Sequence, residues 1–117
     1  MPLPTFTRGE VVLTRFPFTD LSGSAVRPAL VVSPGLIGDD LILAGISSVV
    51  RGPISVMDLR VNAAHPEFGL TGLRLTSVIR LHKLVTVEYS LIIRRLGKLG
   101  PQLLQDADTL LAQAVGL

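Results

Sequence analysis

Two apolar runs separated by a polar segment open the sequence and predict a strand, a loop and a second strand. The runs span residues 11–18 and 29–32 and are rich in β-branched and aromatic side chains, which suit a pleated surface. Between them, Ser22-Gly23-Ser24 has neither the bulk nor the apolarity to continue a strand, so a solvent-facing loop is expected. Pro28 favours an extended conformation at Arg27. The pattern therefore predicts a cation aimed from the junction of this loop with the second strand.

Two motifs in this stretch carry a family resemblance. Gly-Glu-x-x-Leu-x-x-Phe at residues 9–16, followed by a loop and Arg-Pro-Ala-Leu-Val-Val-Ser at residues 27–33, resembles the opening of the MazF/PemK toxin family. Members of that family are small endoribonucleases of prokaryotic toxin–antitoxin systems. Later segments match in order, so the resemblance covers most of the chain.

Length and hydropathy indicate a small domain with more apolar surface than one chain can bury. The 117 residues suit one domain, 1–117, and 48% of them are hydrophobic. The mean hydropathy of +0.55 is high for such a short chain, and a buried interface in a homodimer would account for it. No apolar run approaches the ~20 residues of a membrane span, and the N-terminus does not resemble a signal peptide. We therefore expect a cytoplasmic protein without a membrane partner.

The charge balance permits a nucleic-acid partner without requiring one. Eleven Lys and Arg face nine Asp and Glu, for a net charge of +2. Nine of the eleven cations are arginine, whose planar fork suits phosphate, although a GC-rich genome would also favour arginine. The absence of cysteine excludes disulfides and thiolate metal sites.

Apolar periodicity predicts a mainly β fold that ends in a helix. Strands are expected at residues 10–16, 29–33, 41–46 and 54–61, then at 76–81 and 85–89 with a break around His82-Lys83, and finally at 91–96. Gly100-Pro101 predicts the start of a helix and Gly116 its end. Its apolar face would consist of Leu103, Leu104, Ala107, Leu110, Leu111 and Ala114. The resemblance implies an SH3-like barrel, the MazF/CcdB-like toxin fold, paired as a homodimer with grooves near the interface.

Arg27 and Ser47 are the first two candidates for catalysis. Arg27 falls on the arginine of the Arg-Pro motif, which the resemblance implicates in catalysis, and Ser47 falls where many members have threonine. By themselves, an arginine and a serine at such positions are also typical of a solvated loop and a strand-end cap. Pro28 and Ser48, next to these residues, are expected to contact substrate. Ser22, Gly23 and Ser24 could offer backbone amides to a phosphate, although their composition favours a flexible turn.

Arg80 and His82 form the second pair of catalytic candidates. Arg80 matches a family arginine that precedes an acid by two residues, and His82 occupies the place of that acid, an aspartate proposed as general base. Residues two apart on a strand share a face, so both side chains can reach one phosphate. Histidine can serve as acid or base near neutral pH, and an exposed imidazole without a role is the alternative. His65 and Glu67 make a weak ligand set, so no metal and no cofactor are assigned.

The resemblance implies a sequence-selective, metal-independent endoribonuclease toxin that cleaves single-stranded RNA. Its expected partner is a cognate antitoxin with an acidic, partly disordered tail. The first loop lacks the Glu-Gln pair common in the family, which leaves the sequence preference open. One alternative is a non-catalytic SH3-like dimer that binds a partner. The other is a CcdB-type topoisomerase poison, which the lack of tryptophan disfavours.

Overall fold

The computed structural model describes residues 5–16, 25–48 and 54–117, and it confirms the mainly β fold with a C-terminal helix. The strands are β1 (Glu10–Phe16), β2 (Ala25–Val31), β3 (Asp40–Ser47), β4 (Asp58–Val61), β5 (Ser77–Glu88) and β6 (Ile92–Lys98). Two short 3-10 helices, η1 (Phe68–Thr71) and η2 (Tyr89–Leu91), and the helix α1 (Pro101–Ala114) complete the chain. No helix in these ranges has the length and apolarity needed to cross a membrane.

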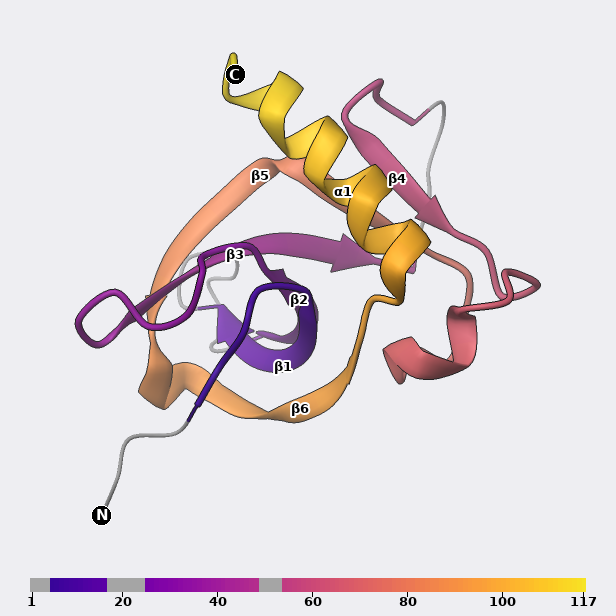
Figure 1. Cartoon of the computed structure of the whole chain (residues 1–117). Coiled ribbons are helices and arrows are strands. Elements are labelled where there is room, and N and C mark those ends of the chain that lie inside the picture. Colours follow the sequence, from indigo (N-terminus) through magenta and orange to yellow (C-terminus); the bar gives the residue numbers. More distant parts are fainter. Residues whose placement is uncertain (1–4, 17–24, 49–53) are drawn as a thin grey trace.

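All six strands belong to one antiparallel sheet in the order β4-β5-β3-β2-β1-β6. The sheet curls strongly, so that β5, η2 and β6 form an outer arc around β1 and β2 (Figure 1). Within the described ranges, the two outermost strands, β4 and β6, do not pair with each other. The result is a barrel-like sheet that stays open between β4 and β6.

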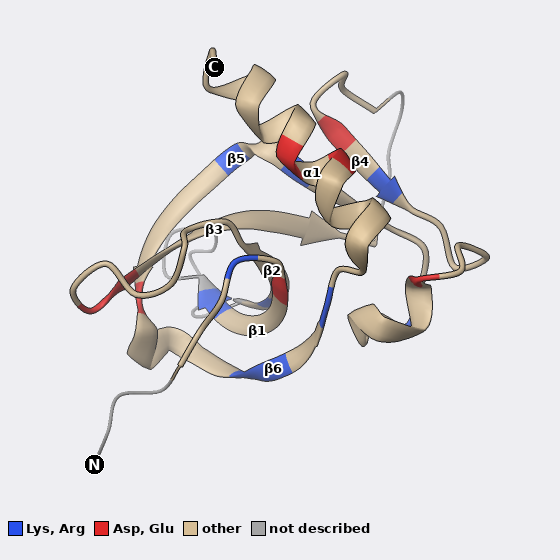
Figure 2. Cartoon of the chain, viewed as in Figure 1, with Lys and Arg blue, Asp and Glu red and all other residues tan. Residues whose placement is uncertain are grey.

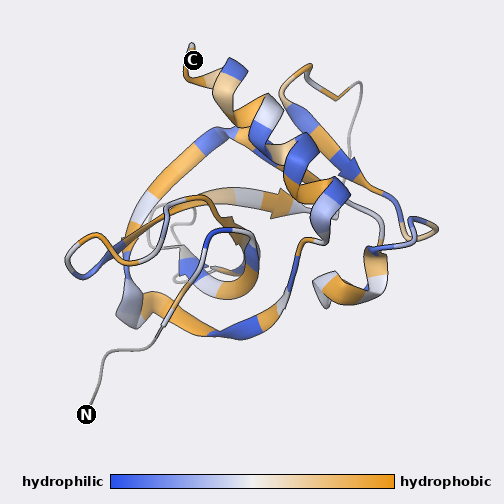
Figure 3. Ribbon diagram, viewed as in Figure 1, coloured by the Kyte–Doolittle hydropathy of each residue, from blue (hydrophilic) through white to orange (hydrophobic). Residues whose placement is uncertain are grey.

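Both faces of the sheet bury apolar side chains, as β3 illustrates. Leu41 and Leu43 belong to one apolar cluster, whereas Ala44 and Ile46 belong to a second cluster that includes residues of α1. The strand expected at residues 41–46 is thus present and contributes apolar side chains to both clusters. Apolar residues occur on every strand and on α1 (Figure 3). Burial on both sides makes the central strands a rigid platform for the side chains at their ends.

Helix α1 covers one face of the sheet with the side chains that its periodicity selects. Leu103 and Ala107 are buried, and Leu104, Leu110 and Leu111 pack against the same cluster. The helix ends at Ala114, and Gly116 has a φ of +79°, a conformation that glycine adopts without strain. The sequence prediction of the helix is confirmed, and five of the six residues expected on its apolar face pack into the cluster, all but Ala114.

The start of α1 is capped by Glu67, a residue distant in sequence. Its Oε1 accepts a hydrogen bond from the Leu103 N–H at 2.9 Å, and its Oε2 accepts one from the Gln102 N–H at 3.1 Å. These N–H groups lie in the first turn, where no helical carbonyl can accept them. A Cβ on Gly100 would lie 2.5 Å from Cδ of Glu67, so a larger residue there would displace the Glu67 carboxylate from the helix.

The same contacts shift the ionisation of Glu67. The hydrogen bond from Leu103 lowers the pKa of the Glu67 carboxyl from its usual 4.5, and desolvation opposes this change. The bond from Gln102 and the charge of His65 lower the pKa further. The ionised carboxylate is therefore the form that holds the helix.

The second strand begins earlier than its sequence predicts. Pairing with β1 extends β2 back to Ala25, where the expected strand began at Ala29. Arg27 and Pro28 consequently lie inside the strand and pair with Thr14 and Leu13, so the expected junction at Arg27 is wrong. The cause is the ladder with β1, which continues through Arg27 and Pro28 as far as Ala25.

Two later strands also differ from expectation. Strand β4 is restricted to Asp58–Val61, because a turn at residues 56–57 precedes it, whereas the sequence indicated a strand from residue 54. Strand β5 runs without interruption from Ser77 to Glu88, so the break expected around His82-Lys83 is wrong. An irregularity does occur there, in the pairing of β5 with β3.

Candidate functional site

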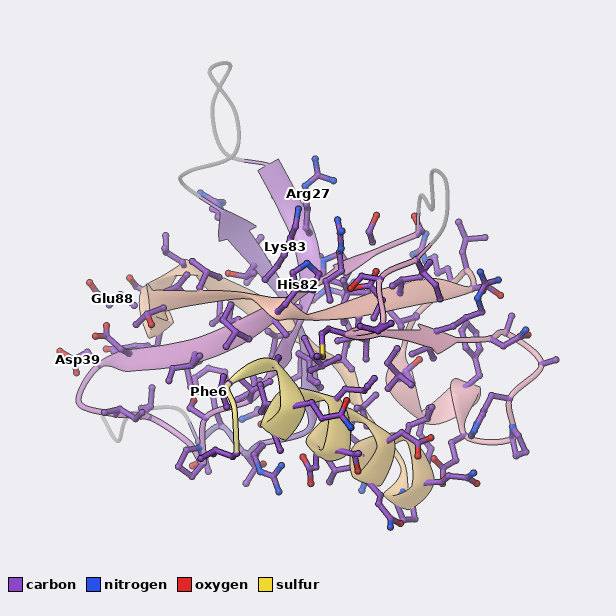
Figure 4. The ribbon with its side chains drawn as sticks, turned by 90° about the horizontal axis from the view of Figure 1, so that it is seen from above. Phe6, Arg27, Asp39, His82, Lys83 and Glu88 are labelled. Atoms are coloured by element: carbon purple, nitrogen blue, oxygen red, sulfur yellow. The ribbon has the colours of Figure 1, made fainter. Side chains whose placement is uncertain are left out.

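A surface hollow of about 560 Å³ lies between β2, β3 and β5. Arg27 of β2, Ser47 of β3, and Arg80 and His82 of β5 all line it. In Figure 4, Arg27, His82 and Lys83 lie on the side of the sheet away from α1. The fold thus brings together the four residues that the sequence proposed for catalysis.

A β-bulge in β5 shapes one wall of this hollow. Gly45 of β3 pairs with Arg80, whereas the preceding residue, Ala44, pairs with Leu84. Residues 81–83 of β5 are therefore additional residues with no counterpart on β3. A bulge bends its strand and redirects the side chains within it. Because Gly45 has no side chain, the floor of the hollow opposite the bulge stays open.

The charges around the hollow are mainly positive. Among the described residues, no acidic side chain lies within ion-pair distance of Arg27 or Lys83. Nε of Arg80 and Nδ1 of His82 lie 3.6 and 3.7 Å from the same oxygen, Oδ1 of Asp58. Helix α1, on the other side of the sheet, carries acidic charges only (Figure 2). An anionic ligand would therefore be attracted to the face that holds the hollow.

A second hollow, of about 500 Å³, adjoins the first. Pro28 lines both, and Ser48 lines the second hollow directly after Ser47 of the first. Two exposed arginines, Arg74 and Arg94, also line it, and neither has an acidic partner in the described part of the chain. The two hollows share Pro28 and together present Arg27, Lys83, Arg74 and Arg94 on the surface.

The structure also shows which site residues sequence reasoning missed. Lys83, Asp58, Arg74 and Arg94 line or border the hollows without having been proposed. Only Lys83 could have been found, since it is adjacent to His82, whereas the others depend on strand pairing and loop placement. The proposed substrate contacts at residues 22–24 lie outside the described residues.

His65 and Glu67 have roles in holding the chain together. Nδ1 of His65 accepts a hydrogen bond from the Glu67 N–H at 3.0 Å, which fixes the turn before η1. The Glu67 carboxylate is occupied by the first turn of α1. The pair therefore joins the segment between β4 and β5 to the helix.

Comparison with known protein families identifies the family of this chain. Residues 7–115 match the model of the PemK-like, MazF-like toxin of type II toxin–antitoxin systems. The chain belongs to this toxin family. The resemblance seen in residues 9–16 and 27–33 is thus confirmed over nearly the whole chain. A comparison with curated proteins gave no match.

Structures of MazF-type toxins share the fold. An endoribonuclease in complex with its cognate antitoxin from a mycobacterial species has a TM-score of 0.70 and 22% identity, over 95% of both chains. The Mycobacterium tuberculosis toxin MazF-mt6 has a TM-score of 0.66 and 19% identity, over 92% of this chain and 97% of that one. MazF from Deinococcus radiodurans has a TM-score of 0.73 and 17% identity, over 97% and 99%. At these identities the similarity establishes the MazF-like fold.

Proposed function

We propose that this toxin is a metal-independent, sequence-selective endoribonuclease that cleaves single-stranded RNA. The observation that carries the proposal is the convergence of Arg27, Ser47, Arg80 and His82 on one hollow. Family membership supports it, as do the MazF-type neighbours described as endoribonucleases. The proposed substrate is RNA in the cytoplasm.

The arrangement suits an in-line attack of a ribose 2′-hydroxyl on the adjacent phosphorus. In this step the O2′–P bond forms and the P–O5′ bond breaks, which gives a 2′,3′-cyclic phosphate and a 5′-hydroxyl. Arg27 and Arg80 would stabilise the charge that develops on the phosphoryl oxygens. His82 can move a proton near neutral pH, either from the 2′-hydroxyl as a base or to O5′ as an acid. Ser47 would orient a phosphate oxygen.

The decisive experiment is incubation of the purified protein with mixed single-stranded RNA in the presence of a chelator. We expect discrete fragments with cyclic phosphate ends. Binding without fragments would refute the proposed cleavage and favour an interaction protein. The ends of the fragments, mapped by sequencing, would give the recognised motif.

We also propose that the toxin is a homodimer whose antitoxin occupies the RNA site. The high hydrophobic content motivates the dimer, and light scattering should give twice the chain mass of 12.5 kDa. Arg27 and Lys83, which lack acidic partners among the described residues, would attract an acidic antitoxin tail. The neighbours solved with MazE or another cognate antitoxin support such a partner. An antitoxin that binds without protecting RNA would contradict the shared site.

A further inference from the structure

A buried carboxylate, that of Asp58, borders the first hollow and has no role in the proposed reaction. Asp58 begins β4, and its side chain is only 3% exposed. Its Oδ2 accepts a hydrogen bond from the Ser55 N–H at 2.9 Å, and its own N–H donates to the Ser55 carbonyl at 3.0 Å. These two bonds close a turn that fixes the direction of the carboxylate.

The second oxygen of this carboxylate is left without a hydrogen bond. Oδ1 of Asp58 is buried and has no donor within hydrogen-bond geometry in the described residues. Its charged neighbours are Nε of Arg80 at 3.6 Å and Nδ1 of His82 at 3.7 Å. Buried polar atoms are nearly always hydrogen-bonded, so an unpaired carboxylate oxygen beside two catalytic candidates calls for an explanation.

Strand pairing holds these three residues together. Asp58 pairs directly with Arg80 across β4 and β5, and the next N–H along β5, that of Leu81, donates to the Met57 carbonyl at 3.1 Å. Strand β5 therefore stays attached to β4 at the point where its bulge separates it from β3. His82, two residues after Arg80, lies on the same face and reaches Asp58 from the bulge.

We propose that Asp58 is the positioning residue of His82 in the RNA cleavage site, an inference that rests on the proposed function. In this arrangement Oδ1 accepts a hydrogen bond from the Nδ1–H of the neutral imidazole. Nε2 then carries no proton and can accept one from a substrate in the hollow. The distance of 3.7 Å is longer than a hydrogen bond. Catalytic contacts are often long in a free enzyme and tighten with substrate, and we expect this contact to shorten in the same way. The family resemblance would put an aspartate at position 82, where this chain has His82. In the proposed arrangement, Asp58 of the neighbouring strand β4 supplies a carboxylate at this place.

The alternative is that Asp58 serves only to neutralise Arg80. The two roles differ in what they demand of the imidazole, since a partner of Arg80 has no effect on the tautomer of His82. Nitrogen-15 NMR distinguishes the Nδ1–H form from the Nε2–H form. The sequence holds only one other histidine, His65, so the signals are assigned with His82→Gln. In the wild-type protein above neutral pH we expect His82 in the Nδ1–H form.

Asp58→Asn should reverse this preference. The Ser55 N–H keeps the oxygen of the new amide as its acceptor, so the NH₂ group turns toward His82 and donates to Nδ1. The imidazole then carries its proton on Nε2, the wrong atom for a base in the hollow. Cleavage should fall by up to about 10²–10⁴-fold, the usual contribution of a positioned acid or base, with KM little changed.

Asp39→Asn is the matched control, because Asp39 is exposed and lies far from His82 at another end of the sheet (Figure 4). This variant should keep the wild-type tautomer and rate. An Nε2–H form in the wild type, or a tautomer that Asp58→Asn leaves unchanged, overturns the proposal even if cleavage falls. The wild-type tautomer is measured without Asp58→Asn, so the test holds if that variant does not fold. If the wild type cuts no RNA, the proposed function fails, and the spectrum still decides whether Asp58 orients His82.

Discussion

Four cations that lack acidic partners among the described residues line the two hollows, and their number predicts how RNA binding depends on salt. They are Arg27 and Lys83 in the first hollow and Arg74 and Arg94 in the second. Arg80 is not one of these four cations, because Asp58 lies within ion-pair distance and balances its charge. Each cation that neutralises a phosphate releases a counterion, so the affinity falls as salt is added.

The size of the effect follows from this number. For single strands, log K changes with log salt by about −0.7 for each phosphate neutralised, so four contacts give a slope of about −2.8. A rise from about 50 to about 200 mM salt would then weaken binding about 50-fold. In Arg94→Gln, three contacts remain, so the slope should drop to about −2.1 and the weakening to about 20-fold.

The assay is fluorescence polarisation with a short labelled RNA whose 2′-hydroxyls are methylated. Without a free 2′-hydroxyl the strand cannot be cleaved by the proposed route, so binding to the wild-type protein is measured at equilibrium. Arg8→Gln is the control variant, since it removes the same charge from a residue that pairs with Asp108 of α1, away from the hollows. It should leave the slope near the wild-type value.

Two results would refute this reasoning. A wild-type slope near zero would mean that the cations of the hollows do not meet phosphates. An equal change of slope in Arg94→Gln and Arg8→Gln would mean that RNA responds to the net charge of the protein and not to the second hollow.

Three further predictions concern single side chains. Arg27→Ala should reduce cleavage about 10²–10³-fold, the usual cost of removing one group that stabilises transition-state charge, and a full rate in a fragment assay would exclude that role. His82→Gln should reduce cleavage about 10²–10⁴-fold; an unchanged rate would make His82 a bystander. Glu67→Gln should lower the thermal stability at neutral pH, with the exposed Glu88→Gln as control. Because folding lowers the pKa of Glu67, its contribution is present above the usual 4.5 and is lost as pH falls through the lowered value, so variant and wild type should converge in acid.

Local patterns in the sequence predicted the elements whose form depends on neighbouring residues. The spacing of Leu103, Ala107 and Leu111 specifies the buried face of α1, and Gly100-Pro101 specifies its start. The bounds of β1 followed from its apolar and β-branched residues. In each case the information lies within a few residues of the element.

Features that depend on pairing between distant segments were not predictable in this way. Strand β5 continues through His82 because the Leu81 N–H donates a hydrogen bond to the Met57 carbonyl, next to β4. The pairing of β5 with β3 shifts its register at the same point. The proximity of Asp58 to His82 depends on the same ladder, and no spacing in the sequence encodes it. The family resemblance identified the four catalytic candidates of the first hollow because it carries such long-range information.

The position of β1 in the sheet has a consequence for the order of folding. Strand β1 pairs on one side with β2, its neighbour in the chain, and on the other with β6, which comes from the far end of the sheet-forming sequence. The first ladder closes a short loop, whereas the second must close a loop of most of the chain, with a larger loss of entropy. Non-local pairings of this kind slow folding relative to helical proteins of similar size. A refolding molecule therefore presents the free edge of β1 to other chains until β6 arrives, and its yield should fall as protein concentration rises.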